Sequence, residues 1–234
     1  MFKRFKILGI VLAVVGLGFL GGGIFAYSQV QAGANALQDF SAAQNVELTY
    51  NENGQLTDRG EVEGAQAILG LLESEWGYQT KASELNPNDP LVNTSSEYMY
   101  QMALVAYHTL NSTVEVTLTE DVEYNGETFE AGTYDVPVEG RYWADFDRAH
   151  PLEGPARAIA WTGVAHALIA ELGVGSVTAS TLQLGTGVAG FMAGVGAVFV
   201  ALGLGLVWAA AGTTKRPELK EAPAIETIEE PVKA

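Results

Sequence analysis

Cysteine is absent from the 234-residue chain, and only three histidines are present: His108, His150 and His166. The absence of cysteine excludes disulfides, thiolate metal sites and cysteine nucleophiles. The histidines show no H-x-D or H-E-x-x-H spacing, so an iron site of two histidines and one carboxylate lacks its sequence signature. We therefore expect no metal and no cofactor.

Basic residues are also scarce, at 12 against 28 acidic ones. Residues 28–183 contain only five basic side chains and 23 acidic ones. Nucleic-acid binding is excluded because no basic stripe is present to neutralise phosphates. Such an acidic segment either stays soluble through its charge or attracts cationic partners and counterions. Composition leaves both readings open.

Familiar catalytic patterns are missing as well. No G-x-S-x-G elbow occurs, and the residues around Ser176 do not match it. Two G-x-G-x-x-G matches, at 16–21 and 185–190, lie inside apolar runs. A dinucleotide-binding loop needs a strand before this motif and a helix after it, and neither match follows a strand signal. The sequence thus predicts a protein that is not an enzyme.

Two long uncharged runs, at 7–27 and 184–212, dominate the chain. Each exceeds the roughly 20 apolar residues that cross a bilayer. We expect a membrane protein with two transmembrane helices flanking an extracytoplasmic α+β domain at 28–183. A cleaved signal peptide is the alternative for the first run, although its length exceeds the usual signal core of about 7–15 residues.

Basic residues lie at the outer ends of both runs, at Lys3, Arg4, Lys6, Lys215, Arg216 and Lys220. Positive flanks face the cytoplasm. The pattern therefore places the basic segment 1–6 and the tail 213–234 inside the cell, with the acidic domain outside the plasma membrane. The tail is rich in proline and glutamate, so we expect it to be disordered.

The middle segment carries helical patterns of period 3.6. Residues 28–44 continue the first run as a stalk, and an apolar stripe predicts a second helix over 61–76. Asp89-Pro90 is expected to open a third helix. Gly154-Pro155 is expected to open a fourth, which Gly173 would close.

Strand patterns fill the remainder of this segment. Residues 111–143 alternate with period two and predict three or four antiparallel strands, with Asn125-Gly126 at a hairpin turn. Asn53-Gly54 marks a shorter hairpin before the second helix.

Small residues recur at spacings of three and four within the two apolar runs. Lipid tails are as apolar as the helices, so helix association in membranes depends on close backbone approach, which small residues allow. The alternative is that glycine is simply common in membrane helices. The expected packing surface, toward the chain's other span or another integral membrane protein, consists of Gly18, Gly22, Gly187, Gly190, Gly194, Ala197, Ala201 and Gly205.

Three stretches carry a family resemblance: KASELNPNDP, the apolar LVNTSSEYMYQMALVAY that follows it, and ARAIAWTGVAHAL before the last run. They resemble small actinobacterial two-span membrane proteins that often carry the label "aromatic ring-opening dioxygenase". The likeness covers the first run, 65–107 and 156–212, and leaves out 111–143. Similar proteins accompany the respiratory cytochrome bcc–oxidase supercomplex, so the resemblance implies an accessory subunit in electron transport.

Three classes of function follow. A non-catalytic accessory subunit of a respiratory-chain supercomplex is the first. The second is a free-standing envelope protein whose acidic outer domain binds a ligand or cations. The third is a metal-dependent enzyme, which would need His108, His150 and His166 to converge and which the missing motif spacing disfavours.

Overall fold

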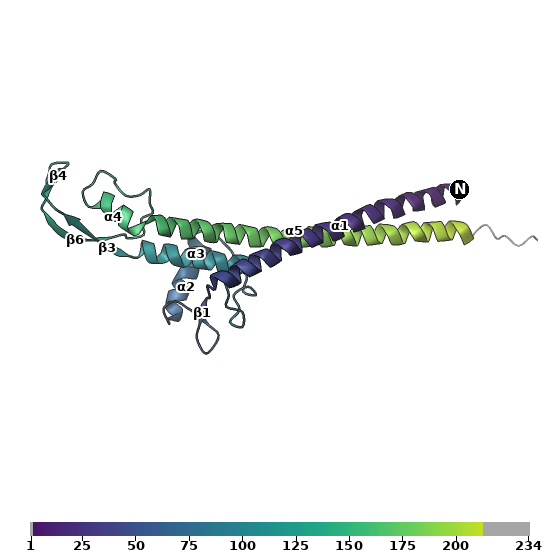
Figure 1. Ribbon diagram of the computed structural model, residues 1–234, viewed down its shortest axis with the longest axis horizontal. Helices are drawn as coiled ribbons and strands as arrows, with labels where there is room; N and C mark the ends of the chain where they lie inside the picture. The colour runs from purple at the N-terminus through teal and green to yellow at the C-terminus, as the bar shows by residue number, and fades with distance from the viewer. Residues whose placement is uncertain (1, 213–234) are drawn as a thin grey trace, which may run out of the picture. The chain divides into compact units, whose positions relative to one another are not determined.

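The computed structural model describes residues 2–212 (Figure 1). Two long apolar helices, α1 (Phe2–Gln44) and α5 (Gly163–Gly212), flank a middle region that contains three two-stranded sheets. Both helices have the length and composition of a membrane span. The expected tail at 213–234 lies outside the described residues. The described residues form two compact units, one of residues 2–25 and 188–212, the other Ala26–Gly187.

In the first unit, the backbones of α1 and α5 touch. A Cβ atom added at Gly16 would lie 2.6 Å from the backbone nitrogen of Val200, and one at Gly23 would lie 2.6 Å from that of Ala193. Atoms cannot approach so closely, so both positions require glycine. Small residues allow helices to pack at this separation without help from hydrophobicity.

The contact residues repeat every seven positions. On α1 they are Gly9, Gly16 and Gly23, and on α5 they are Ala189, Gly196 and Gly203. Gly9 lies against Gly203, Gly16 against Gly196 and Gly23 against Ala189. Residue numbers therefore rise along α1 as they fall along α5, so the two helices are antiparallel. A seven-residue repeat keeps one seam facing the partner helix and favours a left-handed crossing.

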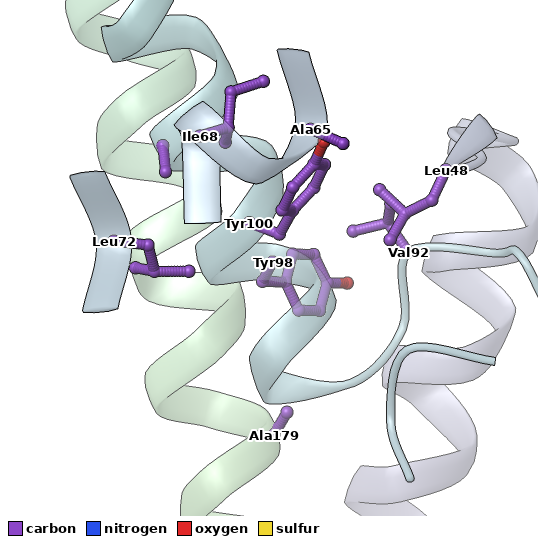
Figure 2. Close-up of a cluster of buried hydrophobic side chains, with 9 residues drawn as sticks. Leu48, Ala65, Ile68, Leu72, Val92, Tyr98, Tyr100 and Ala179 are labelled. Carbon is purple, nitrogen blue, oxygen red and sulfur yellow. The ribbon is translucent and has the colours of Figure 1, made fainter. Parts of the chain in front are cut away.

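The second unit has its hydrophobic core around α2 (Val62–Gly70) and α3 (Ser95–Leu110). A π-helical turn, Leu71–Glu75, extends α2, which confirms the expected helix over 61–76. Figure 2 shows Ile68 and Leu72 beside the side chains of α3, with Ala179 of α5 in the same cluster. The apolar stripe of α2 is therefore buried against α3.

Helix α3 begins at Ser95, so the expectation that Asp89-Pro90 opens it is wrong. Backbone hydrogen bonds hold the preceding segment extended, from Leu48 N to Pro90 O and from Val92 N to Val46 O. The helix is instead capped by Thr94, whose side chain accepts from the Glu97 N–H while the Glu97 carboxylate accepts from the Thr94 N–H. This reciprocal capping box satisfies two backbone donors at once.

Gly173 does not end a helix, which corrects a second expectation. Helix α4 (Glu153–Ala160) is capped at its C-terminal end by Trp161, and α5 begins at Gly163 and continues through Gly173. The Ala165 N–H donates to Thr162 Oγ1 at 3.1 Å, so Thr162 caps the new helix. A Cβ at Gly173 would lie 3.6 Å from the sulfur of Met102, which places this glycine in a packing contact with α3.

The strands form hairpins, as expected for residues 111–143. β3 (Thr113–Leu118) pairs antiparallel with β6 (Gly132–Pro137), and β4 (Val122–Tyr124) pairs with β5 (Glu127–Phe129). Asn125 and Gly126 both have positive φ, at 52° and 84°, as a two-residue hairpin turn requires. A shorter hairpin joins β1 (Thr49–Tyr50) to β2 (Leu56–Thr57), with Gly54 in its turn.

The β3–β6 ribbon has one buried face and one exposed face. Val116 and Val136 are buried in a second hydrophobic cluster that includes Ala156 of α4. On the exposed face, Glu115 lies directly opposite Asp135 in the register. Figure 1 shows the ribbon extending past α4 to the β4–β5 hairpin.

Hydroxyl groups attach the start of α3 to α5. Ser95 Oγ lies 2.9 Å from Ser176 Oγ and 2.7 Å from Ser180 Oγ, and the hydroxyl of Tyr78 contacts Ser95 at 2.9 Å. Buried polar groups are stable when they satisfy one another in this way. The three serines therefore fix the position of α3 along α5.

Glu84 makes a second connection to α5. Its carboxylate accepts hydrogen bonds from Gln183 Nε2 and from the Ser96 N–H, both at 2.9 Å, and pairs with Lys81 Nζ at 3.0 Å. Burial alone would raise the pKa of this carboxyl, but these hydrogen bonds outweigh burial and lower its pKa to about 2.

Our first prediction concerns the glycine seam. Replacing Gly16 and Gly196 together with leucine should separate α1 from α5, because the added side chains collide with backbone. The chain has no cysteine of its own, so cysteines placed at Phe19 and Phe199, whose rings lie 6.4 Å apart, report the contact. Oxidative crosslinking of this pair in membranes should be strong in the parent protein and largely lost in the double-leucine variant.

Gly18→Leu with Gly194→Leu is the matched control, because a Cβ at either position meets nothing within 4 Å. This pair should leave the crosslink unchanged. Equal loss of crosslinking in both variants would contradict the assignment of the seam.

Our second prediction concerns pH. A lowered pKa means that the folded chain favours the ionised Glu84, so its stabilisation is complete above pH 4.5, the ordinary pKa, and disappears as pH falls toward 2. Glu84→Gln should lower the unfolding temperature at pH 7 and lose less stability than the parent between pH 4.5 and 2. Thermal unfolding of the full chain in nanodiscs, followed by circular dichroism, measures both. The exposed Glu52→Gln should behave like the parent.

Candidate functional site

One side of α5 carries a row of small residues. The positions expected to pack on another helix all have exposed side chains or open space: Gly187, Gly190, Gly194, Ala197, Ala201 and Gly205. A Cβ added at any of these four glycines would meet nothing within 4 Å. Spacings of three and four place the six positions along one side of the helix.

The opposite side of α5 is the one that faces α1. Gly196 and Gly203 are buried there and lie seven residues apart along the contact with α1. Sequence reasoning missed these contact glycines because it searched for four-residue spacing. The seven-residue spacing was visible in the sequence and is the signal that identifies them.

Large apolar side chains flank the open face. Phe191 is 72% exposed, and Leu202 is also exposed. Trp208, which is 81% exposed, lies three residues after Gly205 and therefore at the C-terminal end of the row itself. Shallow small residues between large apolar ones form a groove-and-ridge surface of the kind into which another apolar helix packs.

The two expected positions on α1 behave differently. Gly18 faces open space, whereas a Cβ on Gly22 would lie 3.5 Å from the terminal carbon of Met192. Gly22 is therefore beside the α1–α5 contact, and Gly18 is outside it. Whether the open positions on either helix meet a partner stays a prediction.

The three histidines have separate environments. His108 Nε2 lies 3.0 Å from Asp58 Oδ1, and His150 Nδ1 accepts a hydrogen bond from the Leu152 N–H. His166 contacts the ring of Trp143 edge-on, with centroids 5.0 Å apart. Across residues 2–212, no group of three or more histidine, aspartate or glutamate side chains is arranged to hold a metal.

Both G-x-G-x-x-G matches lie in the interior of helices. Gly16, Gly18 and Gly21 belong to α1, and the second match belongs to α5. Neither follows a strand, so the loop that would cradle a pyrophosphate is not formed by these residues.

A group of acidic and phenolic side chains is buried beside α3. Tyr100 is 1% exposed, and its hydroxyl has no hydrogen-bond partner among residues 2–212. Burial and then the charges of Asp58 and Tyr50 raise its pKa, while burial and then Glu97 raise the pKa of Tyr50 to about 12. Both phenols therefore remain neutral at physiological pH. No sequence motif marked this polar neighbourhood.

An apolar groove of about 440 Å³ lies in the second unit, between the C-terminal end of α1 and the N-terminal part of α5. Leu37 and Phe40 of α1 and Leu168 and Val174 of α5 belong to its walls. Its volume is within the range of small-molecule sites. No sequence motif marked it, because its residues come from three separate segments.

Comparison with known proteins adds no relative. Neither protein-family models, nor curated proteins, nor solved structures give a match to this chain.

Proposed function

We propose that the protein is a non-catalytic accessory subunit of a membrane protein complex, and that the open face of α5 packs against a helix of an integral membrane partner. α1 and α5 then span the plasma membrane with both termini in the cytoplasm. The acidic middle region is extracytoplasmic. In this proposal, the apolar side chains of α1 and α5 contact the bilayer, and the open face of α5 contacts the partner helix.

The observation that carries the proposal is the pair of small-residue surfaces on α5. One surface, with Gly196 and Gly203, is already used by α1. The other, with Gly190 and Gly194, is open although it has the same kind of residues. Glycine weakens a helix by up to about 1 kcal/mol relative to alanine, so a second glycine surface is costly unless a neighbour uses it.

A respiratory cytochrome bcc–oxidase supercomplex is the specific partner that we propose. Its support is the resemblance of the three sequence stretches described above to small two-span actinobacterial proteins. The cytoplasmic orientation of both termini is supported by the basic Lys3, Arg4 and Lys6 before α1 and by the basic residues after α5.

The orientation gives a third prediction, which uses the absence of cysteine. A membrane-impermeant maleimide added to intact cells without their outer wall should label Glu120→Cys, an exposed position after β3. It should label Lys3→Cys only after the cells are opened. Labelling of Lys3→Cys in intact cells would overturn the orientation, and loss of this residue from the mature protein would show that the first run is cleaved.

The fourth prediction concerns docking. Gly190→Leu with Gly194→Leu adds bulk to the open face while the helix stays apolar enough to insert. If the two positions contribute contacts of about 1.4 kcal/mol in total, association should weaken roughly tenfold. The variant should therefore reach the membrane in normal amounts but co-purify poorly with respiratory oxidase after mild detergent extraction.

Gly21→Leu provides the control on α1, because this glycine is outside the expected packing surface and a Cβ there also meets nothing within 4 Å among the described residues. Normal co-purification of the control assigns the docking surface to α5. Normal co-purification of the Gly190/Gly194 variant would contradict the proposal.

A further inference from the structure

The groove in the second unit has an apolar interior. Its floor contains Val92 and Tyr98, and Gly175 of α5 lies against the ring of Tyr98, where an added Cβ would be 2.6 Å from a ring carbon. The Tyr98 hydroxyl is 2.8 Å from Ser41 Oγ, and this hydrogen bond is buried. The two polar groups at the floor therefore satisfy each other, and a ligand deep in the groove has no need to hydrogen-bond.

Polar groups lie elsewhere in the lining. Gln44 and Glu171 are exposed, and Thr178 is half-buried. Among the described residues that line the groove, Glu171 alone carries a charge. An anionic head would be repelled there, whereas a neutral or zwitterionic head is accepted. This division suits an amphiphile with a long apolar part.

We propose that this groove binds a hydrocarbon chain of a bilayer phospholipid. The inference rests on the membrane location in the proposed function. The two long walls of the groove belong to α1 and α5. These are the helices that have the length and composition of membrane spans. At the near end of the groove, Leu37 lies ten residues beyond the apolar run of α1 and Thr178 six residues before that of α5, which is about 15 Å and about 9 Å along the helices. Phospholipid chains are the most abundant apolar ligand next to such segments.

A bound hydrocarbon chain would also cover apolar side chains of the groove walls that are exposed to solvent. Phe40 is 49% exposed and Leu168 is 41% exposed, although both belong to the walls of the groove outside the apolar runs. Covering apolar surface contributes about 25 cal/mol for each Å² removed from water. A hydrocarbon chain between these side chains removes the exposed apolar surface of protein and ligand together.

The test uses the full chain in nanodiscs of phosphatidylcholine that contains a photoactivatable diazirine in one acyl chain. After illumination, peptide mapping locates the labelled residues. We expect labels on the span, near Phe191, and additional labels on Val46 and Val92, which lie in non-helical segments that line the groove. Labels on the span without labels on Val46 or Val92 would overturn the inference while leaving the membrane location intact. Absence of both kinds of label would overturn the membrane location as well.

Two variants on adjacent positions make the test specific. Thr178→Trp fills the groove and should lose the labels on Val46 and Val92 while retaining those on the span. Val177→Trp adds the same bulk outside the groove lining, at a side chain that is 67% exposed, and should retain all labels. If native membranes give groove labels only after partner proteins are stripped away, a protein segment occupies the groove and the lipid inference is wrong.

Discussion

Helices of this chain meet where a side chain is missing. In the first unit, Gly16 and Gly196 bring two backbones together at a distance that no Cβ atom would permit. In the second unit, the ring of Tyr98 fills the space in front of Gly175, where a Cβ atom would lie 2.6 Å from a ring carbon. The separation between helices is thus determined by the absence of atoms and not by the strength of hydrophobic contacts, which lipid would weaken. Bulk added at these positions has to move a whole helix.

Elements with strong local signals could be predicted from the sequence. The long apolar runs, the stripe of the helix over 61–76 and the Asn125-Gly126 turn depend on residues close together in the chain. Helix boundaries were harder because two signals competed. Asp89-Pro90 is a good helix start in isolation, but backbone pairing of Pro90 with Leu48 and the capping box of Thr94 determine the actual start. That pairing joins segments more than forty residues apart, which local patterns do not record.

The candidate site was predicted only in part for a related reason. A list of small residues does not reveal which side of a helix faces which neighbour, so the exposed Gly190 and the buried Gly196 look alike in the sequence. Their roles differ because α1 presents glycines every seven residues, which is a property of the pair of helices. The apolar groove also depends on tertiary structure, since Leu37, Val92 and Leu168 come from distant parts of the chain.

The β3–β6 ribbon contains carboxylates that oppose its own stability. Glu115 and Asp135 face each other across the strands, and like charges in this position repel. A two-stranded ribbon is only marginally stable by itself, so this one depends on Val116 and Val136 buried beside α4. The same carboxylates also affect how the ribbon meets other chains. An unpaired strand from another chain that approached either free edge would meet concentrated negative charge, so the ribbon is protected against growing into an intermolecular sheet.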